Sequence, residues 1–388
     1  MKTHLFPSIV NPLKWSLVGA LAFALAACDG GNDAVSTPVT TTVTLASTMS
    51  GDQELPPTVT GALGTGTLSL ESPSLKLSGS FIVNGMLANA GHIHLGNTGA
   101  NGAIIVPMTS TGGGTFAVPA DTVLTQAQAT AFAEGGLYFN AHSTDNPTGE
   151  VRGQIGREVF AAQMSAAQEV PTNASTATGS GLLNFDPVTK KITGRVTLAS
   201  MTATAAHIHT GVLGVNGAII FPLTETGAGS GIWVTAADAV MTDAQISSLK
   251  SGGLYFNAHS PAFPGGEIRG QIGLNVKFAS MNAAEEVPPT TSTATGTGRL
   301  VVDPLTRVAS GSITLTGMTA TAAHIHLGAT GANGAVIVPL SSTAAGVFTV
   351  PASTVLTAEQ FKAYKQGNLY YNAHSAAFPG GEIRGQIR

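Results

Sequence analysis

The segment Leu137-Tyr-Phe-Asn-Ala-His-Ser143 occurs three times in the chain. It recurs at 254–260 and, with Tyr371 in place of Phe, at 369–375. Its apolar residues alternate with Tyr, Asn and His, which is typical of a β-strand with one face in a hydrophobic core. A unit that recurs after 115 to 117 residues is a domain and not a solenoid repeat, so we predict three tandem copies of one domain. Three other motifs recur at the same offsets and contain Met49, His92 and Gly149 in the first copy, Met164, His207 and Gly266 in the second, and Met281, His324 and Gly381 in the third.

The repeat offsets place the copies directly after one another, without long linkers. We assign copy 1 to residues 42–156, copy 2 to 157–273 and copy 3 to 274–388. A leader at 1–27 and a tether at 28–41 precede them. The tether is rich in Gly, Ser, Thr and Pro and is predicted to be flexible.

The leader has the features of an export signal. Lys2 and Lys14 accompany an apolar run at 16–27, which is too short to span a bilayer and matches the core of a signal peptide. The run ends in Leu25-Ala-Ala-Cys28, which resembles the lipobox of bacterial lipoproteins, and Cys28 is the only cysteine of the chain. This resemblance implies a lipid on Cys28 that anchors the protein to a bacterial membrane, facing the periplasm or the cell surface. An ordinary Ala-x-Ala cleavage site followed by a cysteine is the competing interpretation.

Each copy is predicted to be all-β, an antiparallel β-sandwich with one short helix. Short apolar or alternating segments bounded by Gly, Pro, Asn or Ser predict strands. Thr125, Thr242 and Thr357 each begin a capping box, and Gly135, Gly252 and Gly367 are predicted to end the helix that follows. In copy 1 the predicted strands are 65–70, 75–83, 91–95, 103–108, 137–142 and 150–155.

Composition and charge exclude several classes of function. Only 10% of the residues are charged, and the net charge of −4 becomes −6 without Lys2 and Lys14 of the leader. No basic run or basic-aromatic patch is present, so nucleic acid is not an expected partner. The sequence also lacks the Gly-x-Ser-x-Gly, phosphate-loop, His-Glu-x-x-His and Cys-x-x-Cys motifs.

All nine histidines outside the leader lie in the repeated motifs. His92 and His94 are two residues apart in a predicted strand, so their side chains share a face, while His142 ends another strand. A third imidazole beside a His-x-His pair makes a three-nitrogen site suited to copper, zinc, iron or nickel. We therefore predict one metal site per copy, and purely structural histidines are the alternative. The predicted ligands are His92, His94 and His142 in copy 1, His207, His209 and His259 in copy 2, and His324, His326 and His374 in copy 3.

The last predicted strand of copy 1 places Glu150, Arg152 and Gln154 on one face. One interpretation puts Arg152 near the histidines as a fixed positive charge for an anion. A Glu150–Arg152 ion pair that holds neighbouring loops is an equally good interpretation. Glu54, in the Glu-Leu-Pro motif, is predicted to be structural, with a local partner at an edge or turn.

Four ordered motifs per copy resemble the CHRD domain, which is named for chordin. In copy 1 they are Gln53-Glu-Leu-Pro-Pro57, His92-Ile-His-Leu-Gly96, Tyr138-Phe-Asn-Ala-His-Ser143 and Gly149-Glu-Val-Arg-Gly-Gln154. The resemblance covers nearly all of the chain after the leader. CHRD domains occur in chordin, an extracellular binding protein, and in many bacterial proteins, so the resemblance implies no particular activity.

The segment 91–102 also resembles the first copper-ligand strand and following loop of copper/zinc superoxide dismutases. His142 resembles the last copper-binding histidine of those enzymes. This resemblance implies a superoxide dismutase-like Greek-key sandwich, copper on the three histidines, and superoxide or another small anion guided by an arginine. The bridging histidine, the remaining zinc ligands and the disulfide of that family have no counterpart here, so copper is expected and zinc is disfavoured. The arginines matched to the active-site position are Arg152, Arg269 and Arg384.

Two functions are consistent with these residues. The first is a membrane-tethered, extracytoplasmic protein that binds copper in each copy and has superoxide dismutase-like activity. The second is a non-catalytic binding or adhesion module with structural histidines, for which three linked copies would provide avidity.

Overall fold

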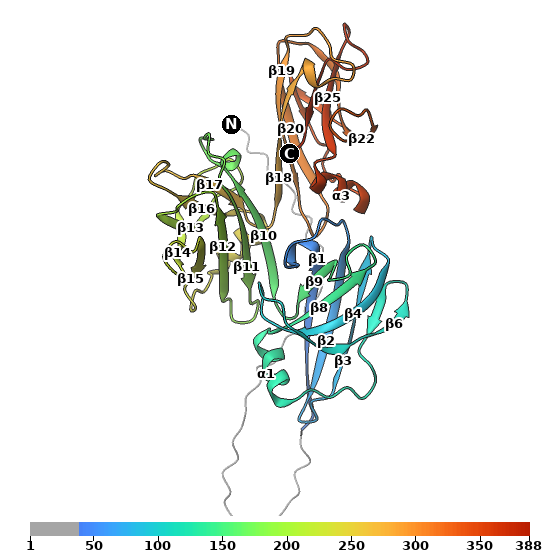
Figure 1. Ribbon diagram of the computed structural model, residues 1–388, viewed down its shortest axis with the longest axis vertical. Helices are drawn as coiled ribbons and strands as arrows, with labels where there is room; N and C mark the ends of the chain where they lie inside the picture. The colour runs from blue at the N-terminus through green and yellow to red at the C-terminus, as the bar shows by residue number, and fades with distance from the viewer. Residues whose placement is uncertain (1–38) are drawn as a thin grey trace, which may run out of the picture.

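The computed structural model describes residues 39–388. The predicted leader, Cys28 and most of the predicted tether lie outside the described residues. Three β-rich copies follow one another along the chain, coloured blue to cyan, green to yellow and orange to red (Figure 1). The first strand begins at Thr41, which pairs with Ser72, so copy 1 takes up the last residue assigned to the tether.

The three copies contain equivalent elements. Copy 1 consists of β1 (Thr41–Ser50), η1 (Gly51–Gln53), β2 (Leu63–Ser72), β3 (Leu77–Asn84), β4 (Ala88–Leu95), β5 (Ala103–Pro107), β6 (Thr109–Gly112), β7 (Thr115–Ala117), α1 (Gln126–Glu134), β8 (Leu137–Ser143) and β9 (Val151–Gln154). Copy 2 consists of β10 (Glu158–Ser165), η2 (Ala166–Gln168), β11 (Thr178–Phe185), β12 (Ile192–Ala199), β13 (Ala205–Thr210), β14 (Ile219–Glu225), β15 (Ile232–Thr235), α2 (Asp243–Lys250), β16 (Leu254–His259) and β17 (Ile268–Gln271). Copy 3 consists of β18 (Asn275–Asn282), η3 (Ala283–Glu285), β19 (Thr295–Val302), β20 (Ala309–Thr316), β21 (Ala320–Leu327), β22 (Ala335–Pro339), β23 (Ser341–Ala344), β24 (Val347–Thr349), α3 (Ala358–Gln366), β25 (Leu369–Ser375) and β26 (Ile383–Gln386).

The strand order confirms the predicted Greek-key architecture. Copy 2 forms a closed antiparallel barrel in the order β10-β11-β12-β15-β14-β13-β16-β17, in which β12 and β13 are consecutive in the chain but not neighbours in the sheet. The connection from β15 to β16 crosses over in the same way and contains α2. Copies 1 and 3 have the same order, since β5 with β6, and β22 with β23, correspond to the single strand β14.

The interruption between β5 and β6 is only one residue long. Met108 lies between them and donates its N–H to the Gly91 carbonyl at 2.9 Å, which keeps the segment in the sheet. Leu340 has the same place in copy 3 and donates to Ala323 at 2.9 Å. The three copies therefore have one fold, and the break in the strand changes little.

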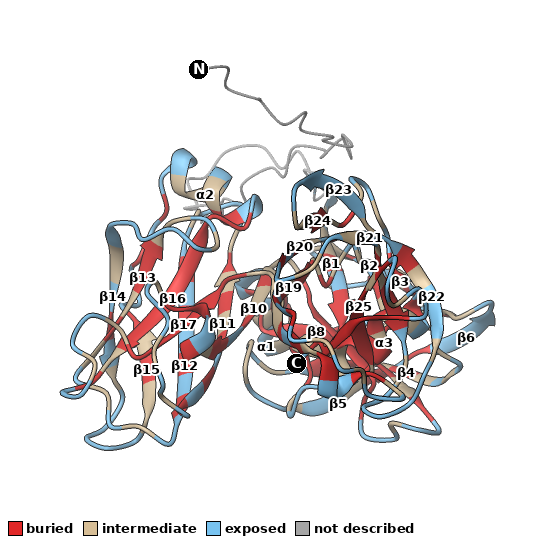
Figure 2. Ribbon diagram, turned by 90° about the horizontal axis from the view of Figure 1, so that it is seen from above, coloured by how far each residue is buried: buried red, intermediate tan, exposed pale blue. Residues whose placement is uncertain are grey.

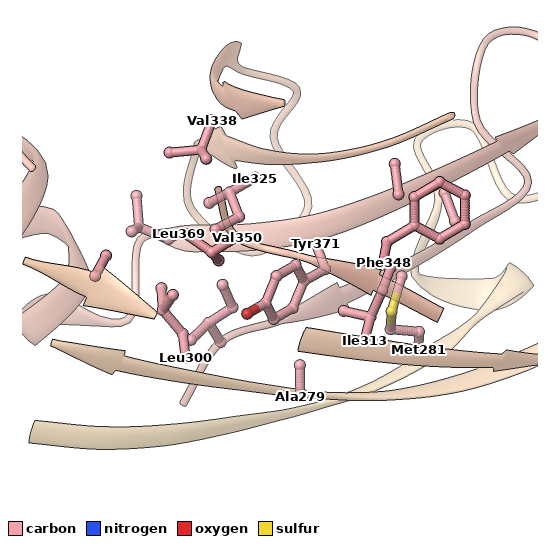
Figure 3. Packing of buried hydrophobic residues seen from close by; sticks show 14 of the residues in the cluster. Ala279, Met281, Leu300, Ile313, Ile325, Val338, Phe348, Val350, Leu369 and Tyr371 are labelled. Atoms are coloured by element: carbon pink, nitrogen blue, oxygen red, sulfur yellow. The ribbon is translucent and has the colours of Figure 1, made fainter. Parts of the chain in front are cut away.

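Each copy has its own hydrophobic core on the inner side of its sheet. In copy 3, Ile325, Phe348 and Tyr371 pack against residues of β18 to β20, as Figure 3 shows. The Tyr371 hydroxyl donates to the Arg299 carbonyl at 2.9 Å, so the buried phenol is satisfied. Period-two alternation places Leu137, Phe139 and Ala141 of copy 1 in the equivalent core, as the sequence predicted.

The outer face of β8 is buried as well. Tyr138 and Asn140 point away from the core, and yet they are only 2% and 4% exposed. They are covered because Glu54 contacts Asn140 and Gly102 contacts Tyr138. The middle strands of each copy are accordingly mostly buried, whereas the loops at the ends are exposed (Figure 2). This covered outer face is where the histidines lie.

The helices begin where the sequence predicted. Thr125, Thr242 and Thr357 each form a complete capping box with the glutamine three residues later. Gly135 and Gly367 end their helices in the left-handed conformation, while α2 ends at Ser251, one residue before the left-handed Gly252. Within residues 39–388, no helix has the length and apolar character needed to cross a bilayer.

Candidate metal centre

Two adjacent strands bring the three histidines of each copy together. In copy 1, His94 lies opposite Tyr138 and His92 lies opposite Asn140 across the β4–β8 pair, so His92, His94 and His142 share the outer face. One nitrogen of each ring lies within 4.8 Å of the others, in all three copies. Metal–nitrogen bonds of about 2 Å would bring these nitrogens to within about 4 Å, so binding requires the rings to close by about 1 Å.

Hydrogen bonds fix which nitrogen of each ring faces the centre. His94 donates its Nδ1–H to the Gly102 carbonyl at 2.9 Å, and His142 donates its Nδ1–H to the Pro147 carbonyl at 3.1 Å. The Nε2 atoms of both rings are therefore unprotonated in the neutral tautomer. Nδ1 of His92 lies 2.9 Å from Nε2 of His142. Because that Nε2 is unprotonated, Nδ1–H of His92 donates to it. A metal ion held by Nδ1 of His92 and Nε2 of the other two rings would replace this hydrogen bond, with the His92 proton moved to its own Nε2.

The buried Nε2 of His94 is the strongest sign that this group could bind a metal ion. Its Nε2 is buried and has no hydrogen-bond partner among the described residues, and the same is true of His209 and His326. An unpaired buried polar atom is costly, and native proteins rarely contain one without a reason. A metal ion at the centre would use this lone pair.

Copies 2 and 3 repeat the arrangement closely. Nδ1 of His207 lies 3.3 Å from Nε2 of His259, and Nδ1 of His324 lies 3.1 Å from Nε2 of His374. The hydrogen bond that orients His94 is repeated too. Nδ1 of His209 lies 3.0 Å from the Gly217 carbonyl, and Nδ1 of His326 lies 3.0 Å from the Gly334 carbonyl. The geometry is therefore a property of the domain and not of a single copy.

Burial favours the neutral form of the three histidines of copy 1. Burial lowers the pKa of His92, and the neighbouring His142 and His94 lower it further. Burial also lowers the pKa of His94 and of His142, although their hydrogen bonds to carbonyls oppose the shift. The shifts have the same direction at His207, His209, His324 and His326. Neutral imidazole is the form that binds a metal, so the centre is prepared for a cation at neutral pH.

Gly102 connects the ligand strand to the loop that follows it. Its carbonyl accepts from His94, and its N–H donates to the Tyr138 hydroxyl at 3.1 Å. A Cβ atom at this position would lie 1.6 Å from the Leu95 carbonyl oxygen, so only glycine fits. Neither this carbonyl nor that of Pro147 was predicted from the sequence, because both contacts are made by backbone atoms.

The ring of Tyr138 packs against the face of the His94 ring. The two rings stack with centroids 4.8 Å apart and an interplanar angle of 13°. The guanidinium carbon of Arg152 lies 3.6 Å from the centroid of the same tyrosine ring, which is a cation–π contact. The equivalent stacks of copies 2 and 3 have the same form: His209, Tyr255 and Arg269, and His326, Tyr370 and Arg384.

The structure places the three arginines in buried positions beside the loop that follows the first ligand strand. Arg152 is 1% exposed, and its two terminal nitrogens donate to the Ala100 and Asn97 carbonyls at 2.9 Å each. Arg269 and Arg384 are buried in the same way. The hydrogen bonds of Arg152 are made to loop carbonyls, whereas Nε of Arg269 and Nη1 of Arg384 have no hydrogen-bond partner among the described residues. Arg152 therefore holds the 96–102 loop beside the histidines.

Two expected partnerships of the acidic residues are corrected. Glu150 does not pair with Arg152: its carboxylate accepts from the hydroxyls of Thr60 and Ser143. Glu54 is structural, as predicted, but its partner is not local, because it accepts from the amide of Asn140, 86 residues later. Ser143 thus donates its hydroxyl to the Glu150 carboxylate.

Glu54 is a buried acid that the sequence did not mark as unusual. It is 5% exposed, and burial raises its pKa to about 7 against the opposing effects of Arg152 and Asn140. Oε1 of Glu54 and Oδ1 of Asn140 are both buried without a partner among the described residues. A proton on the carboxyl group would satisfy one of these oxygens.

The comparisons with known proteins identify the family. Searches of curated proteins and of solved structures find no match to this chain. The CHRD domain matches residues 45–155, 160–272 and 278–387, which are the three copies and together cover more than half of the chain. The chain therefore belongs to the CHRD family and carries three tandem CHRD domains.

Proposed function

We propose that each CHRD domain binds one copper ion through Nδ1 of its first histidine and Nε2 of the other two. The observation that carries this proposal is the buried, unpartnered Nε2 of His94, His209 and His326, whose other ring nitrogen is fixed on a backbone carbonyl. Structural histidines would be expected to have both nitrogens satisfied. The repeat of this arrangement in three copies adds support.

The donor set favours copper. Three neutral imidazoles form the group, and none of its members is a carboxylate or a thiolate. Imidazole suits copper and zinc, and divalent copper binds most strongly in the first-row series, so copper is the expected ion and zinc the weaker competitor. The resemblance to copper/zinc superoxide dismutases supports the same ion at the same three positions.

Superoxide dismutation is a second candidate function. Three protein ligands leave a coordination position open, and His92 lies at the partly exposed side of the centre. Bound copper would supply one-electron redox chemistry there. The chain's own residues would hold the ion, and Tyr138 and Arg152 would keep His94 in place. Arg152 itself is not proposed to contact the anion.

We further propose that the chain works outside the cytoplasm, tethered to a bacterial membrane by a lipid on Cys28. The three CHRD domains support an extracellular-type module. The competing proposal is a non-catalytic binding or adhesion module, in which three linked copies give avidity and the histidines only support the fold.

Metal analysis of the purified mature protein tests the copper proposal. About three copper ions per chain are expected, one for each histidine group. Replacing His94, His209 and His326 with Ala together should abolish binding, while Lys76→Ala, at an exposed ion pair far from the histidines, should leave it unchanged. Micromolar cuprous and cupric ions that fail to bind the intact chain would refute the proposal. A dismutation assay on the copper-loaded protein then separates the two candidate functions. Superoxide decay at the background rate would refute the enzymatic function and leave the copper-binding function in place.

A further inference from the structure

Helix α3 of copy 3 contacts copy 1, although copy 2 separates them in the sequence. Figure 1 shows α3 beside the end of copy 1 where β1 leads into η1. Lys365 of this helix forms an ion pair with Asp52 at 2.6 Å and donates to the Thr58 carbonyl at 3.0 Å. The other carboxylate oxygen of Asp52 accepts from the Asn275 amide of copy 3 at 3.3 Å. Residues from both ends of the chain thus share one network.

This ion pair differs from the surface pairs of the same protein. The side chains of Lys365 and Asp52 are only 11% and 13% exposed, whereas those of Lys76 and Asp121 are 51% and 86% exposed. Surface pairs contribute little to stability. A charge that has been removed from water needs its partner, so the loss of either Lys365 or Asp52 leaves an uncompensated buried charge. The contact is therefore sensitive to both residues.

The backbones of the two copies also fit closely. A Cβ atom on Gly61 would lie 1.8 Å from the carbonyl oxygen of Ala358, the first residue of α3. Gly85 faces the same residue, since a Cβ there would lie 2.8 Å from the Ala358 side chain. Glycine at position 61 is thus required for this approach.

Asp52, Gly61 and Ala358 are specific to their copies, whereas the lysine of α3 has a counterpart in α2, Lys250. Copies 2 and 3 have Thr176 and Thr293 where copy 1 has Gly61, and Ala167 and Ala284 where copy 1 has Asp52. Helices α1 and α2 begin with Gln126 and Asp243 where α3 has the small Ala358. Only copy 1 has both Asp52 and Gly61, and only the helix of copy 3 combines a small first residue with the lysine.

We infer that copies 1 and 3 form a specific pair within one chain, with α3 as the docking helix and the 51–61 segment as its receptor. The three CHRD domains then form one unit, in which the first and the last domain contact each other, and they do not move independently. Since the receptor occurs once and the docking helix occurs once, the contact is satisfied inside the chain. The pairing depends on differences between the copies, whereas the metal centre depends on what they share.

Two substitutions in the full chain test this pairing: Asp52→Ala and Gly61→Thr. Each introduces the residue that copies 2 and 3 already have at that position, so the domain fold tolerates it. Both should speed amide hydrogen exchange in 51–61 and in α3 by about tenfold or more, because the docked state loses its ion pair or its close fit. The radius of gyration from small-angle scattering should be larger in both variants than in the parent chain, because copies 1 and 3 separate.

Lys76→Ala is the matched control, because it breaks an exposed ion pair in copy 1. It should change neither the exchange of these segments nor the scattering. Unchanged exchange and unchanged scattering in both Asp52→Ala and Gly61→Thr would overturn the pairing. Light scattering tests whether the contact lies within one chain. If the parent protein is a dimer and Asp52→Ala is a monomer, α3 docks onto another chain, and the proposal of an intramolecular pair is wrong.

Discussion

Glu54 is a buried acid, and its burial makes the stability of the domain depend on pH. Burial raises the pKa of Glu54 and of Glu169 to about 7, and raises that of Glu286. Below pH 4.5 the acid is neutral in both the folded and the unfolded chain. As the pH rises from 4.5 to about 7, it ionises only in the unfolded chain, so its contribution to stability is lost over this window. For Glu54 and Glu169 the contribution is about 3 kcal/mol each at most.

Replacing all three acids with Gln should remove this pH dependence. The variant Glu54→Gln, Glu169→Gln, Glu286→Gln should melt near the temperature of the parent at pH 5 and clearly above it at pH 8. A glutamine amide can donate to Oδ1 of Asn140, which has no partner otherwise. Thermal unfolding at the two pH values measures the difference, and Glu134→Gln, at an exposed position, is the control. A larger loss of stability at pH 8 than at pH 5 would mean that Glu54 is ionised and paired with Arg152.

Arg152→Lys should loosen the 96–102 loop although it keeps the charge. Lysine lacks the planar fork that reaches the Ala100 and Asn97 carbonyls from two separate nitrogens, and it loses the planar contact with Tyr138. We expect a loss of about 1–3 kcal/mol in the opening free energy of the loop, together with weaker copper binding, because the loop holds the His94 anchor. Hydrogen exchange of the loop amides measures the first effect, and Arg195→Lys on an exposed strand position is the control. If loop protection is normal but anions bind more weakly, Arg152 has the guiding role and not the structural one.

At the scale of single residues, the sequence predicted the histidines and missed their supports. The spacing of His92 and His94 fixes a shared face through the two-residue period of a strand, so their convergence is a local property. The burial of Arg152 depends on carbonyls more than 50 residues earlier in the chain. A carbonyl exists at every residue, so no side-chain pattern marks the ones that are used.

At the scale of elements, the helix caps give a direct prediction. Thr125→Ala removes the side chain that accepts from the Gln128 amide, and should lower the opening free energy of α1 by about 1 kcal/mol, or about fivefold in exchange rate. Thr130→Ala is the matched control, because Thr130 lies on the exposed side of the same helix and alanine favours a helix. Equal exchange rates in α1 for both variants would show that tertiary packing, and not the cap, limits the opening of this helix.

The elements themselves were predicted to different degrees. The capping boxes and the strands β2, β3, β4, β5, β8 and β9 follow from local patterns, and the structure contains them. Strand β1 was missed because Thr41-Thr-Val-Thr-Leu-Ala-Ser-Thr48 is rich in small polar residues and resembles the tether before it. Its pairing with β2 over ten residues makes it a strand, and this partner lies outside any local window.

At the scale of the whole molecule, the repeat predicted three similar copies but not how they contact one another. Motifs shared by the copies define the fold, whereas the contact between copies 1 and 3 depends on Asp52 and Gly61, where the copies differ. A sequence comparison that searches for repeats treats such differences as divergence. Only the spatial arrangement shows that they coincide at one surface.

That surface is joined to the metal centre of copy 1 by hydrogen bonds. Lys365 holds the Thr58 carbonyl, and the Thr58 hydroxyl donates to the Glu150 carbonyl at 2.6 Å. The Glu150 carboxylate accepts from Ser143, whose hydroxyl also accepts from the Asn146 amide. The next residue, Pro147, provides the carbonyl that orients His142. Docking of α3 therefore stabilises the turn that orients His142, one of the proposed copper ligands, in copy 1 and in no other copy.

Asp52→Ala should consequently weaken copper binding at the centre of copy 1 alone. In a chain with His209→Ala and His326→Ala, only that centre is intact, and we expect its affinity to fall by about threefold to tenfold, which corresponds to a coupling of about 0.7–1.4 kcal/mol. The matched background, His94→Ala with His326→Ala, leaves only the centre of copy 2, whose affinity should not change. Competition titration with a chelator measures both backgrounds. Equal weakening in both would mean that Asp52→Ala destabilises the chain generally, and an unchanged affinity in copy 1 would mean that the hydrogen bonds between α3 and His142 transmit no coupling.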